Sequence, residues 1–176
     1  MFIFDYIKLF NLITNTCNEN AAGKILIDNN LTLSVAESCT GGLVSSLLTD
    51  VSGSSSYTKV NFVTYANEAK MDYLGVKEKT LAQQGAVSEQ TAAEMVDGLL
   101  EKTGSDIAIA TTGIAGPTGG TATKPVGLVY ICAGSKENKI IQKYNVNPNY
   151  PRLLIKYMFA KEAIRLLFEF LKGYTK

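Results

Sequence analysis

The chain has 176 residues, of which 46% are hydrophobic, and its 17 basic and 16 acidic side chains leave a formal charge of +1. This length and composition predict one hydrophobic core, so we expect a single domain over residues 1–176, and a balanced charge without basic runs disfavours nucleic acid as a partner. The sequence has no histidine, which excludes a Ser-His-Asp triad, a Cys-His pair and any histidine-ligated metal site.

The cysteines favour a reducing compartment. Cys17, Cys39 and Cys132 are odd in number, widely spaced and without a CxxC pair, so we expect free thiols and a cytoplasmic location. Residues 1–10 are apolar but are interrupted by Asp5 and Lys8. They predict an amphipathic helix rather than an export signal, and no apolar run is long enough to span a bilayer, so we expect no membrane partner.

The first third of the chain alternates helix and strand. Apolar residues at helical spacing over residues 2–27 predict one or two helices, closed by the polar residues 29–30. Residues 31–36 form a short β-rich run, and apolar positions from residue 43 predict a helix after a turn of small residues. This order is a strand, a turn and a helix.

The middle of the chain repeats the alternation. We expect a strand over residues 60–66, a short helix over residues 67–74 stopped by Gly75, and a helix from Ser88 to residue 102 ended by Gly104. Residues 106–110 are nearly all apolar, as in a strand covered on both faces. Residues 111–120 contain too many glycines for a regular element and predict a long loop.

The last third predicts a hairpin and a closing helix. Residues 126–133 and 139–146 are typical of antiparallel strands, and residues 151–172 of an amphipathic helix. Together the elements predict an α/β fold, a three-layer α/β/α sandwich on a mixed, mostly parallel sheet of about five strands. Ligands of such sheets bind beyond the carboxyl ends of the strands, where both glycine-rich segments fall.

These glycine-rich segments are candidate binding loops. Residues 37–42 (Glu-Ser-Cys-Thr-Gly-Gly) precede a helix, where free N–H groups suit an anion or oxyanion, although a simple helix cap explains them equally well. The loop over residues 113–120 could bring backbone amides close to a phosphate or oxyanion. It matches neither the P-loop nor GxGxxG, which disfavours an ATPase or a dinucleotide enzyme.

Without histidine, a serine nucleophile needs another base. Ser54, Ser55 and Ser56 are candidate nucleophiles, and a desolvated Lys70 on the helix that follows the next strand is a candidate base. A solvated helix lysine is the simpler interpretation of Lys70 taken alone. A competing hypothesis combines Glu37, Cys39 and Lys70 as a nitrilase-like cysteine amidase.

Several motifs together resemble one family. They are Ala-Glu-Ser-Cys-Thr-Gly-Gly (36–42), Gly-Ser-Ser (53–55), Phe-Val-Thr-Tyr-Ala-Asn-Glu-Ala-Lys (62–70), Gly-Ala-Val-Ser (85–88), Thr-Gly-Ile-Ala-Gly-Pro-Thr-Gly-Gly (112–120) and Lys-Pro-Val-Gly (124–127). In this order they resemble the CinA C-terminal domain family, over roughly residues 20 to 170. Its characterised enzymes are nicotinamide-nucleotide amidohydrolases.

The resemblance implies deamidation of nicotinamide mononucleotide to nicotinate mononucleotide and ammonia in pyridine-nucleotide salvage, without metal or cofactor. By matching positions, it implies Ser55 as nucleophile, Lys70 as base and Tyr65 as a further catalytic residue. The substrate-binding residues that it implies share the two loops and the start of the last helix: Ser38, Thr40, Gly41, Gly42, Thr112, Gly113, Gly116, Gly119 and Arg152.

The chain departs from the family pattern before the last helix. Tyr150-Pro151-Arg152 stands where the family usually has Gly-Asp-Arg, and the retained arginine is a candidate phosphate ligand. We expect a small-molecule nucleotide as partner and a homodimer or higher homo-oligomer. The alternative function is a nucleotide-binding module without turnover, linked to competence or DNA-damage responses.

Overall fold

The computed structural model describes residues 3–174 and contains one mixed sheet with the strand order β2-β1-β3-β4-β5. β1 (Leu33–Glu37) is parallel to β2 (Thr58–Val63) and to β3 (Ile107–Gly113), its neighbours on either side. β4 (Leu128–Gly134) and β5 (Lys139–Asn145) continue the sheet as antiparallel strands. The predicted mixed sheet is confirmed.

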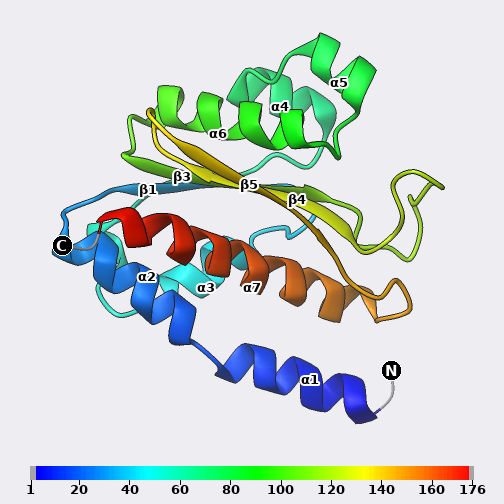
Figure 1. Cartoon of the computed structure of the whole chain (residues 1–176), viewed down its shortest axis with the longest axis horizontal. Helices are drawn as coiled ribbons and strands as arrows, with labels where there is room; N and C mark the ends of the chain where they lie inside the picture. The colour runs from blue at the N-terminus through cyan, green and yellow to red at the C-terminus, as the bar shows by residue number, and fades with distance from the viewer. Residues whose placement is uncertain (1–2, 175–176) are drawn as a thin grey trace.

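Helices cover both faces of this sheet (Figure 1). On one face lie α2 (Cys17–Asp28), α3 (Leu43–Thr49) and α7 (Arg152–Leu171), with α1 (Ile3–Thr14) outside them. On the other face lie α4 (Asn67–Leu74), α5 (Glu78–Gln84) and α6 (Glu89–Thr103). Two 3-10 turns complete the described chain, η1 (Ser54–Ser56) and η2 (Lys172–Tyr174). The arrangement is the predicted three-layer sandwich.

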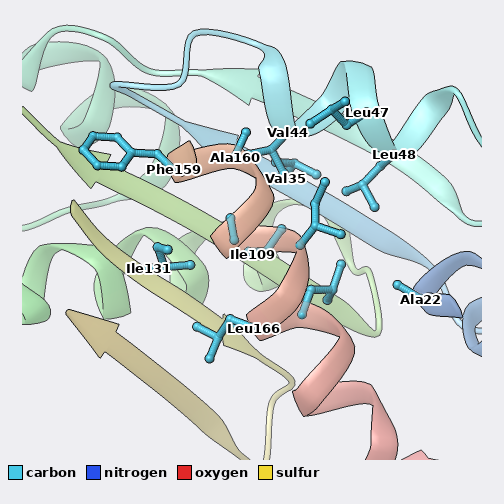
Figure 2. Packing of buried hydrophobic residues seen from close by; sticks show 14 of the residues in the cluster. Ala22, Val35, Val44, Leu47, Leu48, Ile109, Ile131, Phe159, Ala160 and Leu166 are labelled. Carbon is cyan, nitrogen blue, oxygen red and sulfur yellow. The ribbon is translucent and has the colours of Figure 1, made fainter. Parts of the chain in front are cut away.

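The larger core lies between the sheet and the layer of α2, α3 and α7 (Figure 2). Val35, Ile109 and Ile131 come from three neighbouring strands and pack with Phe159 of α7 and Ala22 of α2, all of them buried. Every residue of β1 is buried, as expected for a strand covered on both faces. β1 is therefore fixed from both sides at the centre of the fold.

The second core holds α4 against the sheet through α6. α6 packs on small side chains of the sheet, Ala36, Ala108 and Ala110. α4 then packs on α6 at Gly98, where a Cβ would lie 1.7 Å from the backbone oxygen of Leu74. Only glycine permits this close approach of the two helices. Gly98 therefore sets the position of α4 above the sheet.

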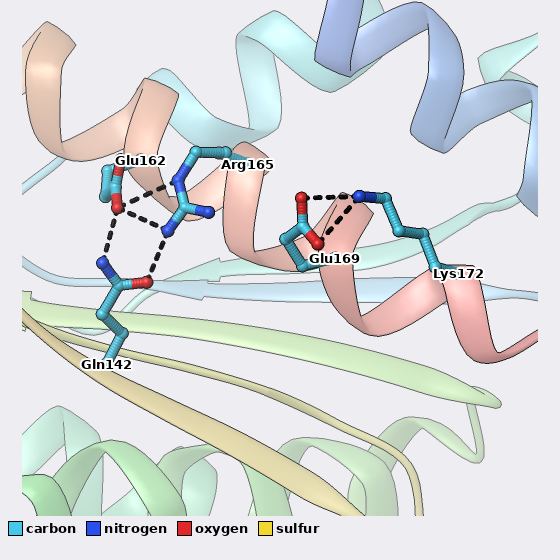
Figure 3. A network of polar contacts seen from close by, with 5 residues as sticks. All are labelled: Gln142, Glu162, Arg165, Glu169 and Lys172. Carbon is cyan, nitrogen blue, oxygen red and sulfur yellow. Dashed lines mark hydrogen bonds and ion pairs between the residues drawn. The ribbon is translucent and has the colours of Figure 1, made fainter.

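A polar network fixes α7 to the edge strand β5 (Figure 3). Gln142 of β5 donates to the carboxylate of Glu162 at 2.6 Å, and Arg165 donates to the Gln142 side-chain oxygen at 2.7 Å. Arg165 also pairs with Glu162 at 2.8 Å. The network thus fixes the middle of α7, which begins at Arg152, to the sheet. No helix in the described residues is long and apolar enough to cross a bilayer.

Two parts of the fold differ from the sequence-based expectation. β3 continues through Thr111, Thr112 and Gly113, which were assigned to the glycine-rich loop, because all three pair with β4. The helix α5 was not predicted, because seven residues are too few for a clear apolar period. The apolar run over residues 2–27 forms two helices from Ile3 onward, and Phe2 lies outside the described residues.

Candidate active site

A cavity of about 250 Å³ opens at the carboxyl ends of β1 and β3. Its lining brings together residues from five segments of the chain: Ser38, Cys39, Tyr65, Asn67, Lys70, Ala86, Val87, residues 112–116, Thr118, Gly119 and Arg152. This is the edge of the sheet where ligands of such folds bind. The cavity contains hydroxyl groups, one lysine and one arginine, and it is the candidate active site.

Lys70 occupies the inner end of the cavity. Its side chain comes from the middle of α4 and is 1% exposed. The amine donates to the Thr64 carbonyl at 2.9 Å, the Tyr65 carbonyl at 3.2 Å and the Ser38 hydroxyl at 3.1 Å. Burial lowers the pKa of Lys70, against smaller opposing effects of Cys39 and Glu68. The prediction of a desolvated lysine, rather than a solvated one, is supported by this environment.

Two hydroxyl side chains follow the central strands into the cavity. Ser38 comes directly after β1, and Thr112 lies near the end of β3. The Thr112 hydroxyl donates to the Ala86 carbonyl at 2.7 Å, which ties the segment before α6 to the sheet. The Ser38 hydroxyl has the Lys70 amine as its neighbour. Ser38 is therefore the serine that this chain places beside its buried lysine.

Arg152 and Tyr65 form the rim of the cavity. The Arg152 guanidinium donates to the Tyr65 hydroxyl at 2.9 Å and to the Gly116 carbonyl. These contacts join the start of α7 to the glycine-rich loop, although Tyr150 and Pro151 replace the usual family residues. A guanidinium at a cavity mouth is well suited to a phosphate.

The turn after β1 does not provide the expected anion site. The buried carboxylate of Glu37 accepts from the N–H groups of Gly42 at 2.9 Å, Val44 at 3.1 Å and Ser45 at 2.8 Å, and from the Ser45 hydroxyl at 2.6 Å. These are the free donors at the start of α3, and an acidic side chain at a helix N-terminus satisfies them. The start of α3 is therefore already occupied.

Three predicted binding residues consequently lie outside the cavity lining. Gly41 and Gly42 form the turn into α3, and Thr40 is buried with its hydroxyl 2.8 Å from that of Thr111. Their role in this structure is to shape the turn that follows Ser38. The start of α3 is capped by the Glu37 carboxylate, and not by a serine or threonine hydroxyl as the helix-cap interpretation assumed.

The structure also disfavours Cys39 as a nucleophile. Burial raises the pKa of the Cys39 thiol to about 12, so the thiol is neutral at physiological pH, whereas the thiolate is the reactive form. Glu37, the acid of the nitrilase-like hypothesis, is engaged at the start of α3. The arrangement of Glu37, Cys39 and Lys70 does not form such a site.

Ser55 is separated from Lys70 within the chain. It is exposed in η1, directly before β2, whereas the Lys70 amine contacts Thr64, directly after β2. A six-residue strand at ~3.3 Å per residue separates the two ends by roughly 20 Å. The expected pair of Ser55 and Lys70 is therefore not formed in this chain. Ser55 precedes β2 and the Lys70 amine lies beside the residue that follows β2, so the two lie at opposite ends of this strand.

The glycines of the loop over residues 113–120 allow close packing of neighbouring segments as well as close approach of a ligand to the backbone. A Cβ at Gly113 would lie 2.5 Å from the Leu128 carbonyl, because β3 and β4 meet there. Gly116 has a φ of +67°, and a Cβ would lie 2.4 Å from a Val126 methyl. Gly113, Gly116 and Gly119 all line the cavity, as predicted, but the first two are also required by their neighbours.

Sequence reasoning missed two residues beside the lysine. Asn67, the first residue of α4, lines the cavity. The Thr64 hydroxyl is buried and has no hydrogen-bond partner. Both stand in the segment Phe-Val-Thr-Tyr-Ala-Asn-Glu-Ala-Lys, whose concentration of polar residues after a strand was the available signal.

The fold and the cavity define a small α/β protein with a buried lysine and a serine at the carboxyl end of its central strand. The sequence model described as the CinA C-terminal domain matches residues 15–171, and the chain belongs to this family. A CinA-like protein of Chloroherpeton thalassium is 50% identical over 157 residues, which are 88% of this chain and 37% of that protein. A CinA-like protein of Endomicrobium trichonymphae is 49% identical over 148 residues, 84% of this chain and 34% of that protein. The chain thus spans about a third of the length of these curated relatives.

Solved structures show the same fold. The competence/damage inducible protein CihA of Agrobacterium tumefaciens has a TM-score of 0.80 and 40% identity, covering 90% of this chain and 96% of that one. A CinA superfamily protein of Klebsiella pneumoniae has a TM-score of 0.84 and 31% identity, covering 90% and 98%. Most of this chain therefore has a counterpart in whole solved chains of the family.

Proposed function

We propose that the chain hydrolyses the carboxamide of a nicotinamide nucleotide, with Ser38 as nucleophile and Lys70 as general base. The observation that carries this proposal is the environment of the Lys70 amine, which is buried among two carbonyl oxygens and one hydroxyl. Among the described residues, Lys70 has no ion pair with a carboxylate. No carboxylate therefore contacts its charge directly, and the more distant Glu68 opposes the effect of burial only in part.

The three partners of this amine suit its neutral form. A neutral amine has two hydrogens and one lone pair, whereas an ammonium has three donors and no acceptor. The carbonyls of Thr64 and Tyr65 can only accept, so they take the two hydrogens. The Ser38 hydroxyl can donate, so it can direct its proton to the lone pair. Lys70 can then accept that proton as Ser38 reacts.

The reaction follows from this pair. Ser38 Oγ attacks the carboxamide carbon while its proton passes to Lys70 Nζ, giving a tetrahedral intermediate. The C–N bond then breaks, and the Lys70 ammonium returns the proton to the departing nitrogen, which leaves as ammonia. Water attacks the resulting ester on Ser38 with Lys70 again accepting the proton, and the Lys70 ammonium returns it to Ser38 Oγ as the C–O bond breaks. The products are free Ser38, ammonia and a carboxylic acid, which ionises to the carboxylate and gives its proton to ammonia in solution.

The substrate class is supported by the mouth of the cavity and by the motifs that resemble nicotinamide-nucleotide amidohydrolases. Arg152 supplies one cation at the rim, about where a phosphate would lie when the amide enters towards Lys70. A charge-assisted contact of this kind is worth about 1.5–3 kcal/mol. One cation and a small polar cavity fit a mononucleotide with a single phosphate.

The test is ammonia release from nicotinamide mononucleotide by the purified chain without added metal. Ser38→Ala is expected to lower kcat by at least about 10³-fold. Ser55→Ala is the matched control, because it removes the same hydroxyl from an exposed turn at the other edge of the sheet, and we expect it to retain activity. Loss of activity in Ser55→Ala alone would remove Ser38 from the mechanism. Nucleotide binding without ammonia release by the unchanged chain would favour the non-catalytic module.

A further inference from the structure

α1 carries an apolar stripe on a side that its own chain leaves uncovered. Ile3, Tyr6, Phe10 and Ile13 follow one another at intervals of three, four and three residues, and Ile7 lies beside them. All five are exposed, Ile3 to 72% and Phe10 to 66%. Intervals of three and four align side chains along one line of a helix, as at the a and d positions of a coiled coil. The stripe is therefore a seam suited to another helix.

The opposite side of α1 is attached to the body of the protein. Leu9 is buried. The Lys8 amine donates to the Tyr150 hydroxyl at 2.8 Å and lies 4.4 Å from the centre of the Tyr150 ring. A rotation of α1 that buried the stripe against its own chain would break these contacts. Figure 1 shows α1 at the outer edge of the molecule, beyond α2 and α7.

We propose that this stripe pairs with the same stripe of a second copy of the chain, so that two α1 helices pack antiparallel about a two-fold axis. In this order Ile3 faces Ile13 of the second copy, and Tyr6 faces its Phe10. Each contact occurs twice, as in any interface between identical surfaces. The antiparallel order also places the positive end of each helix dipole beside the negative end of the other.

The exposed area is sufficient for such an interface. The five stripe residues together expose on the order of 600 Å². Burying this area on both copies gives about 1,200 Å² in total, which is the lower end of the range for specific interfaces. Two isolated helices of three turns would not pair stably in water, but each α1 is already held by its own chain at Leu9 and Lys8. The conformational entropy of forming α1 is therefore already lost when the single chain folds, and dimer formation does not have to offset it.

The charges of α1 favour a protein partner over a lipid surface. Helices that lie on membranes carry several basic residues on their polar face. The helix α1 has two charged residues, Asp5 and Lys8, and Lys8 is engaged with Tyr150. α1 also lies outside the region matched by the family, residues 15–171. The surface thus belongs to this chain beyond its family domain.

Sedimentation velocity of the full chain over roughly 1 to 100 µM tests the pairing, because a dimer is concentration dependent. We expect a dimer for the unchanged chain and an increase of at least about 100-fold in its dissociation constant for Phe10→Glu. Asn11→Glu is the matched control, because it adds the same charge one residue away, off the seam. Circular dichroism should show equal helix content in all three proteins. A monomeric unchanged chain, or a Phe10→Glu dimer of unchanged affinity, would overturn the proposal.

A mixing experiment tests the antiparallel order even if single variants lose stability. Tyr6→Lys and Phe10→Glu should each be monomeric alone. Mixed together they should form a heterodimer, because one contact becomes Lys opposite Glu and the other remains Tyr opposite Phe. A mixture that stays monomeric would contradict the antiparallel pairing. If the unchanged chain is monomeric in solution and co-sediments with vesicles of phosphatidylcholine and phosphatidylglycerol, the stripe binds lipid instead.

Discussion

The buried carboxylate of Glu37 gives the sharpest test of how the site is built. The change Glu37→Gln keeps the size of the side chain and replaces one carboxylate oxygen with an NH2 group. One oxygen of Glu37 accepts from Gly42 and Val44, and the other accepts from the backbone and hydroxyl of Ser45. If the NH2 group turns towards Gly42 and Val44 it faces two N–H donors, whereas towards Ser45 it faces one N–H donor and a hydroxyl that can rotate to accept from it. The amide should therefore turn towards Ser45, and the hydrogen bond from the Ser45 N–H is lost.

The size of the effect follows from these contacts. A hydrogen bond to a charged group is worth about 1.5–3 kcal/mol, so its loss lowers the free energy of unfolding by about that amount. The other bonds become neutral, and the favourable interaction with the dipole of α3 disappears, which adds up to about 1 kcal/mol. Because domains are typically stable by ~5–15 kcal/mol, a loss of about 1.5–4 kcal/mol is a large part of the total.

Urea unfolding followed by circular dichroism measures this loss. With a slope of ~1–3 kcal/mol per molar, the midpoint should fall by about 0.5 M or more. Glu101→Gln, at an exposed position of α6, is the control and should change stability by less than about 0.5 kcal/mol. A loss below about 1 kcal/mol in Glu37→Gln would show that the carboxylate does not hold the turn after β1.

Five further predictions concern the site and its support. Because burial lowers the pKa of Lys70, ammonia release should rise with pH through one ionisation below the ordinary lysine value, and Lys70→Arg should be almost inactive at every pH because arginine stays charged. The unfolded chain binds the Lys70 proton more tightly than the folded chain does, so the contribution of Lys70 to the free energy of unfolding should rise with pH until the unfolded lysine also loses its proton. Lys70→Met should remove this pH dependence in urea titrations. Arg152→Ala should raise KM for nicotinamide mononucleotide by about 10- to 100-fold and affect the phosphate-free riboside less; equal losses on both substrates would make the arginine structural. Cys39→Ser should retain most of kcat, and the activity of the unchanged chain should resist thiol reagents even where these modify the exposed Cys17, because the Cys39 thiol is buried and neutral; inactivation by such a reagent at Cys39 would contradict this. Gly98→Ala should destabilise the fold by about 1–3 kcal/mol in thermal unfolding, since its Cβ would overlap the backbone of Leu74; an unchanged melting temperature would show that α4 can move away at no cost.

Local signals in the sequence were sufficient for most of the elements and for the contents of the site. Apolar runs, caps and stop signals indicated β1, the helix α4 with its stop at Gly75, and the hairpin of β4 and β5, because these depend on neighbouring residues. The absence of histidine directed attention to lysine as a base, and Lys70 is the buried amine of the cavity. Thr112, Gly116 and Arg152 were identified through motifs and also line it.

Only the tertiary structure decided which of these residues meet. Ser38 and Ser55 are both serines in glycine-containing turns, but Ser38 follows β1 and Ser55 precedes β2, and parallel strands send these turns to opposite edges of the sheet. The same packing lets Glu37 occupy the start of α3 and leaves Cys39 neutral. Sequence fixes residue types and local conformation, whereas strand direction and burial determine distances and pKa values, so the partner of Lys70 could be identified only once β1, β2 and α4 were placed together.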